Sequence, residues 1–121
     1  MFNDELKDYL LIAETIKSAN VNNEIAIAIA PKNVDTVIIA KAADELLNIS
    51  GISVSFVLGE FNNEIYISGR SLGDINIQVV LEAMGGGGHM NIAGTKIANS
   101  DMNSVVNQLN EAIKKYLRIG E

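Results

Sequence analysis

Four consecutive glycines, Gly85 to Gly88, constrain the fold of this 121-residue chain more than any other feature. A glycine inside a regular element costs about 0.5–1 kcal/mol relative to alanine, so the run is expected to end any helix that precedes it. One glycine at that point would be an ordinary helix C-cap, but a cap does not account for four. The run therefore predicts either positive φ angles or a ligand that approaches closer than a Cβ atom would allow.

Hydrophobic periodicity on both sides of the run predicts alternating helices and strands. Apolar spacings of three and four predict helices over 3–19, 34–49, 75–84 and 101–117, with Asn33, Asp74 and Ser100 or Asp101 as N-caps of the last three. Alternation predicts strands over 24–30, 52–58, 65–68 and 92–98, the middle two joined as a hairpin. The order α-β-α-β-β-α-β-α indicates a single α/β domain with a mixed β-sheet and flanking helices.

Two of these elements carry specific packing expectations. In the first helix, Leu6, Leu10, Ala13 and Ile16 form the predicted apolar stripe. In the first strand, isoleucine alternates with alanine from residue 25 to 30 and no polar side chain interrupts. This pattern predicts a buried strand whose alanine face allows a helix to pack closely.

Composition and charge exclude several classes of protein. A hydrophobic content of 48% is typical of a globular domain, and the longest uncharged run, 46–59, is too short and too polar for a membrane helix. The N-terminus lacks the order of a secretory signal, so we expect a cytoplasmic domain. The chain has no cysteine, which excludes disulfides, and its net charge of −6 argues against binding of long nucleic acids.

Arg70, Ser71 and His89 flank the glycine run and suggest a phosphate site. The run is not a Walker loop, because no Lys-Ser or Lys-Thr follows, and it leaves a helix rather than a strand, unlike a dinucleotide fingerprint. Successive glycine N–H groups can form an anion-binding nest, while histidine and the arginine fork can donate to phosphate oxygens. Taken singly, His89 could be structural, Arg70 a surface salt bridge and Ser71 a loop-closing hydroxyl.

The chain offers no convincing catalytic or metal-binding set. One histidine and scattered carboxylates do not form a metal cluster, and no serine has a base and an orienting acid at a suitable spacing. The pairs Asp44-Glu45 and Lys114-Lys115 are predicted to lie on solvated helix faces. The residues alone therefore indicate a phosphate-binding module that needs residues from elsewhere for chemistry.

The segment from Arg70 to His89, with Arg-Ser at its start and Gly-Gly-Gly-Gly-His at its end, resembles the DHHA1 domain of DHH-family phosphoesterases. It is similar in particular to bacterial cyclic di-AMP phosphodiesterases that carry PAS, degenerate GGDEF, DHH and DHHA1 domains. The likeness extends to residues 35–48 and 54–58 and covers most of the chain from about residue 20. The chain departs from the family pattern after His89, where Asn91 stands one position later than expected.

The resemblance implies a manganese-dependent phosphodiesterase that hydrolyses cyclic di-AMP to linear pApA. Manganese would be held by a DHH domain of the same polypeptide, absent from this chain, where it would activate water. Arg70 and Ser71 would contact a phosphate, and Gly86, Gly87, Gly88 and His89 would hold cyclic di-AMP or a short linear dinucleotide.

The resemblance also implies a domain organisation. Residues 1–20 would be a connector helix and 21–121 the substrate-binding domain, a C-terminal piece that is inactive alone. The full-length protein would be membrane-anchored, with this domain on the cytoplasmic side.

Two alternative functions remain open at this point. One is a partner domain of a nanoRNase or single-strand exonuclease, which the acidic charge disfavours for long polymers but not for dinucleotides. The other is a non-catalytic RNA-binding or dimerisation module, similar to DHHA1-like domains attached to alanyl-tRNA synthetase. A stable dimer that binds no nucleotide would favour the second, and a homodimer is left open in every case.

Overall fold

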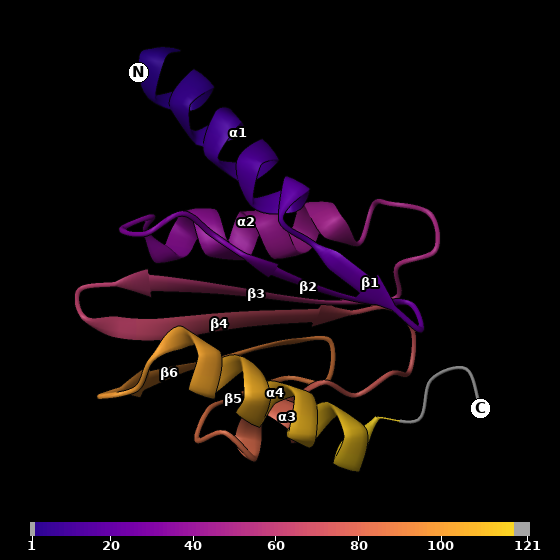
Figure 1. Ribbon diagram of the computed structural model, residues 1–121. Helices are drawn as coiled ribbons and strands as arrows, with labels where there is room; N and C mark the ends of the chain where they lie inside the picture. Colours follow the sequence, from indigo (N-terminus) through magenta and orange to yellow (C-terminus); the bar gives the residue numbers. More distant parts are fainter. Residues whose placement is uncertain (1, 118–121) are drawn as a thin grey trace.

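The computed structural model, which describes residues 2–117, contains one six-stranded sheet with helices on both faces (Figure 1). In chain order the elements are α1 (Phe2–Lys17), β1 (Asn20–Asn22), β2 (Ile25–Ile29), α2 (Thr36–Leu46), β3 (Val54–Phe61), β4 (Glu64–Ser71), α3 (Gln78–Glu82), β5 (Gly87–Gly88), β6 (Ile92–Ala98) and α4 (Met102–Tyr116). The predicted α/β class with a mixed sheet is confirmed. Periodicity missed the two short strands β1 and β5.

The strand order is β1-β2-β3-β4-β6-β5, with β2 and β3 parallel and every other neighbouring pair antiparallel. The predicted hairpin is confirmed as β3 and β4, and its turn residues Asn62 and Asn63 both have positive φ angles of 52° and 63°. Asparagine tolerates this left-handed conformation better than most residues. The short strands β1 and β5 form the two edges of the sheet.

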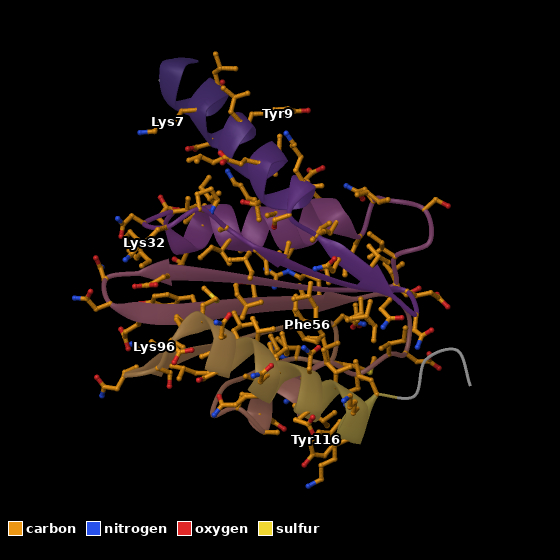
Figure 2. All side chains as sticks on the ribbon, viewed as in Figure 1. Lys7, Tyr9, Lys32, Phe56, Lys96 and Tyr116 are labelled. Carbon is orange, nitrogen blue, oxygen red and sulfur yellow. The ribbon has the colours of Figure 1, made fainter. Side chains whose placement is uncertain are left out.

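The sheet separates two hydrophobic clusters, with α1 and α2 on one face and α3 and α4 on the other (Figure 1). Ala26 and Ala28 of β2 are fully buried in the α2 cluster, so the predicted close helix contact on the alanine face is confirmed. Ile25 and Ile27 point to the opposite cluster, whose largest buried side chain is Phe56, seen between the sheet and α4 in Figure 2.

The predicted N-caps are partly wrong. α2 is capped by Asp35, whose Oδ1 accepts a hydrogen bond from the Ile38 N–H at 3.1 Å, and not by Asn33. Asp74 caps no helix, since α3 begins four residues later without a side-chain cap. Asp101 is confirmed as the cap of α4, and the hydrogen bond from the Ser104 N–H lowers the pKa of its carboxyl.

The predicted apolar stripe of α1 is confirmed only at Ile16, which packs against the domain together with Leu11 and Ile12. Leu6 and Leu10 are 61% and 58% exposed, and Ala13 is exposed as well. Figure 1 shows the N-terminal half of α1 projecting away from the sheet, and Tyr9 lies on this part in Figure 2. None of the helices within residues 2–117, α1 included, has the length and apolar character needed to cross a membrane.

Candidate functional site

The structure brings Arg70 and the glycine run to neighbouring strands at one side of the sheet. Arg70 lies near the end of β4, directly opposite Ile92 of β6. Gly87 and Gly88 form β5, which pairs with the other edge of β6, and the N–H of His89 donates to the Ile92 carbonyl at 2.7 Å. Arg70 and His89 therefore flank the same residue from opposite sides.

Residues that lie opposite each other in antiparallel strands present their side chains on the same face of the sheet. On the face that carries α2, one row joins Ser68, Gly94 and Gly87 across three strands. The row beside it on one side contains Arg70 and Ile92, and the row on the other side contains Tyr66 and Lys96.

A hollow with a volume of about 610 Å³ lies on this face, where α2 packs over β3 and β4 but leaves β6 open. Its lining is Thr36, Tyr66, Ile67, Ser68, Gly85, Gly86, Gly94, Thr95 and Lys96. Two glycines of the run, Gly85 and Gly86, thus line this concave surface together with Tyr66 and Lys96.

Three of the four consecutive glycines have a reason within the fold. Gly85 has a φ of 86°, the left-handed conformation typical of a residue that follows a helix. A Cβ on Gly86 would collide with the Gly94 carbonyl oxygen and with Thr95. Gly88 has a φ of 143°, and a Cβ there would lie 2.5 Å from the Ile92 carbonyl oxygen.

Gly87 has no such reason. A Cβ built on it meets no heavy atom within 4 Å, and its φ lies outside the left-handed region. Because Gly87 pairs with Gly94, that Cβ would project from the same face as Ser68. The fold therefore does not require glycine at this position.

Three amide N–H groups in and beside the run are not free to bind an anion, contrary to the anion-binding nest that the sequence suggests. The N–H groups of Gly85, Gly86 and His89 donate to the carbonyls of Glu82, Leu81 and Ile92 at 3.1, 2.8 and 2.7 Å. These donors are occupied by the fold itself. They cannot contribute to the ring of free N–H groups that a nest requires.

Arg70 is held in place by Asp44 of α2. Its Nε donates to Asp44 Oδ1 at 2.7 Å and its Nη1 to the Gly69 carbonyl at 2.8 Å, and the side chain is only 12% exposed. The Arg70 Nη2 makes no hydrogen bond to a described residue, so this guanidinium nitrogen is free to donate to a ligand. The sequence predicts only that Asp44 lies on a solvated helix face. Its contact with Arg70 could not be predicted, because the two residues are 26 positions apart and their pairing leaves no periodic signal.

Ser71 and Asn91 tie together the two loops beside the site. The buried Ser71 hydroxyl donates to the Ile75 carbonyl at 2.6 Å and accepts from Asn91 Nδ2 at 2.9 Å. Asn91 Nδ2 also donates to the Gly73 carbonyl at 3.0 Å. The Ser71 hydroxyl thus closes the loops, one of the two roles that the sequence left open. To contact a phosphate directly, it would have to break its hydrogen bonds with Ile75 and Asn91.

Replacing Ser71 with alanine should lower the free energy of unfolding by about 1–3 kcal/mol, because the Ile75 carbonyl would lose the donor hydroxyl and the half-buried Asn91 amide would lose one of its acceptors. Urea unfolding followed by circular dichroism measures this loss. Ser68→Ala is the matched control, since Ser68 is half-buried on the same strand and its hydroxyl makes no hydrogen bond to a described residue. Equal losses in the two variants would contradict the structural role of Ser71.

Metal binding finds no support within the described part of the chain. No group of three or more histidine, aspartate or glutamate side chains lies together there. The described residues around Arg70 and His89 therefore provide no metal centre of their own.

A family profile described as the DHHA1 domain matches residues 22–118. The chain belongs to the DHHA1 family. The DHHA1 domain is 37% identical over 100% of its length to a protein of Geobacillus thermodenitrificans named cyclic-di-AMP phosphodiesterase GdpP. It is 43% identical over 67% of its length to cyclic-di-AMP phosphodiesterase PdeA of Listeria monocytogenes. The chain spans 19% and 12% of these two relatives.

Solved structures share the fold of this DHHA1 domain. An exopolyphosphatase-related protein from Bacteroides fragilis superimposes with a TM-score of 0.79 at 22% identity, over 90% of this chain and 34% of that one. RecJ in complex with Mn²⁺ from Thermus thermophilus gives 0.68 at 13%, over 91% and 17%. The C-Ala domain of Aquifex aeolicus alanyl-tRNA synthetase gives 0.58 at 18%, over 78% and 96%. At these identities the likeness shows the fold alone.

Proposed function

We propose that this DHHA1 domain is the substrate-binding part of a manganese-dependent phosphodiesterase that hydrolyses cyclic di-AMP to linear pApA. The observation that carries the proposal is Gly87, where the fold does not require a glycine and where the open Cβ position lies on the same face of the sheet as Arg70. The identity of 37% to a relative named a cyclic-di-AMP phosphodiesterase supports this choice of substrate.

In this proposal each side chain has a separate task. The free part of the Arg70 fork donates to a phosphate oxygen, and the exposed His89 adds a second donor from the far side of Ile92. Gly87 lets the sugar-phosphate backbone of the nucleotide lie close to the protein backbone, and Gly86 and Gly88, which pack tightly against β6, hold this segment in place beneath the nucleotide. Ser71 holds the loops that position Arg70 and His89.

The chemical step is assigned to a DHH domain of the same polypeptide, outside this chain. Its Mn²⁺ ions would supply a water nucleophile activated for attack on phosphorus. This domain alone would then bind nucleotide without turnover. We further propose that the complete enzyme is membrane-anchored with this domain on the cytoplasmic side, where a soluble dinucleotide would reach it.

An NMR titration of the 121-residue chain with cyclic di-AMP, pApA and AMP tests the proposal. Selective shifts of amides 69–72 and 85–94 are expected, and their ranking by ligand would identify the preferred nucleotide. A preference for linear dinucleotides over cyclic di-AMP would instead indicate a nanoRNase partner. Unchanged spectra at millimolar concentrations of every ligand would contradict the proposal and favour a non-catalytic interaction module.

Arg70→Ala should weaken cyclic di-AMP binding by about 1.5–3 kcal/mol, or roughly 10- to 150-fold, because a charge-assisted hydrogen bond to phosphate is lost. The same titration measures this change. Lys41→Ala, which removes a positive charge from the exposed surface of α2, is the control. A similar weakening in both variants would mean that overall charge, rather than a contact from Arg70, governs binding.

A further inference from the structure

The hollow is also lined by Tyr66 of β4 and Lys96 of β6, which lie on the side of the Ser68 row away from Arg70. These two residues lie directly opposite each other, so their side chains stand together on the open face. Tyr66 is half-buried against the α2 cluster, whereas the Lys96 side chain is 62% exposed. The function proposed above uses neither residue.

The spacing along β4 fits one nucleotide unit. Tyr66 and Arg70 point to the same face and are four residues apart, which corresponds to about 13 Å along a strand. Between them lies the row of Ser68, Gly94 and Gly87, which offers no bulky side chain. A phosphate at Arg70 therefore has a flat path to Tyr66.

The chemistry of the far end suits a heterocyclic base with an exocyclic amino group. The Glu64 carboxylate accepts from the Tyr66 hydroxyl at 3.5 Å, and its Oε1 lies 3.8 Å from Lys96 Nζ. A carboxylate acceptor beside an ammonium donor complements an amino group next to a ring nitrogen, the pattern on the edge of adenine. The Tyr66 ring provides an aromatic wall, and bases stack on such rings with little cost in side-chain entropy.

We propose that this end of the hollow is a nucleobase subsite for an adenine-type base, with Tyr66 as the aromatic contact and Lys96 and Glu64 as hydrogen-bonding partners. The inference rests on the proposed function, because the phosphate of the same nucleotide is placed at Arg70 and His89. It adds recognition of the base, the part of the nucleotide to which the function proposed above assigns no residue.

The test compares AMP with ribose 5-phosphate, which carries the same phosphate and sugar without a base. In the unmodified 121-residue chain, both ligands should shift the amides of Gly87 and His89, but only AMP should shift those of Tyr66 and Lys96. Lys96→Ala and Tyr66→Leu should each weaken AMP binding about fivefold or more and leave ribose 5-phosphate binding unchanged.

Lys32→Ala is the matched control for Lys96→Ala. Lys32 lies 3.7 Å from Glu60 in an ion pair similar to that of Lys96 with Glu64, but it does not line the hollow. Figure 2 shows both lysines near the same end of the sheet, so the two variants change the local charge alike. Lys32→Ala is expected to bind AMP as the unmodified chain does.

The possible results separate the subsite from the proposed function. Unchanged AMP affinity in Lys96→Ala, with normal shifts at Gly87 and His89, would overturn the subsite alone. Absence of shifts with ribose 5-phosphate and with AMP would overturn the function on which it rests. Tyr66→Leu removes a partly buried ring, so a loss of its native spectrum would leave the decision to Lys96→Ala, which changes an exposed side chain.

Discussion

Gly86→Ala should lower the free energy of unfolding by about 1–3 kcal/mol, the range expected for overpacking of a tight contact. The added methyl group would collide with the Gly94 carbonyl oxygen and with Thr95, whose Cα would lie 2.9 Å away. Backbone atoms cannot rotate out of the way as a flexible side chain can. The segment before β5 must therefore move away from β6, or β6 must distort.

Urea unfolding of Gly86→Ala and Gly87→Ala, measured side by side, makes this prediction specific. The two variants add the same methyl group to adjacent residues of the same segment, but the Cβ of the second meets no atom within 4 Å. The midpoint should fall for Gly86→Ala at an unchanged denaturant dependence, which indicates a loss of stability rather than a change of state. Equal midpoints for the two variants would contradict the packing described for Gly86.

Most of the fold could be predicted from the sequence, because its larger elements carry strong side-chain patterns. The alternation of isoleucine and alanine in β2 and the Asn62-Asn63 turn required no knowledge of their neighbours. β1 and β5 could not be predicted, because strands of two or three residues are too short to show periodicity. They are strands only because they pair with β2 and β6. Local patterns therefore identify elements that are long enough to show a periodic apolar face.

The error in α1 has a different cause. The helix carries apolar side chains on two faces, one with Leu6 and Leu10 and one with Leu11 and Ile12. Periodicity predicts the helix correctly but cannot decide which face is buried, because that depends on the approach of α2. The choice is a matter of tertiary packing, which has no signature within the helix.

The candidate site was predictable in its location but not in its internal contacts. Glycines and charged residues that mark the segment from Arg70 to His89 are visible in the sequence, and the sheet register does bring them together. The anchoring of Arg70 by Asp44 and the opposition of Tyr66 and Lys96 depend on pairings between distant residues. Only the structure shows that three of the four glycines serve the fold and that Gly87 does not.

Gly87→Ala is accordingly expected to abolish cyclic di-AMP binding in the NMR titration. Its methyl group would project from the open face beside Gly94, where the proposed ligand lies against the backbone. Because the added Cβ meets open space, we expect the variant's free energy of unfolding to stay the same or to rise by up to about 1 kcal/mol, since alanine makes the unfolded chain less flexible.

The combination of lost binding and retained stability is what distinguishes a ligand-facing glycine from a structural one. A structural glycine would lose both together, as Gly86 should, because the native contacts around it would be disturbed. Ser68→Ala provides the control on the same row, since it removes an atom from the hollow and should leave binding intact. Retained affinity in Gly87→Ala would show that the nucleotide does not pass over this residue, and the glycine at position 87 would then need another explanation.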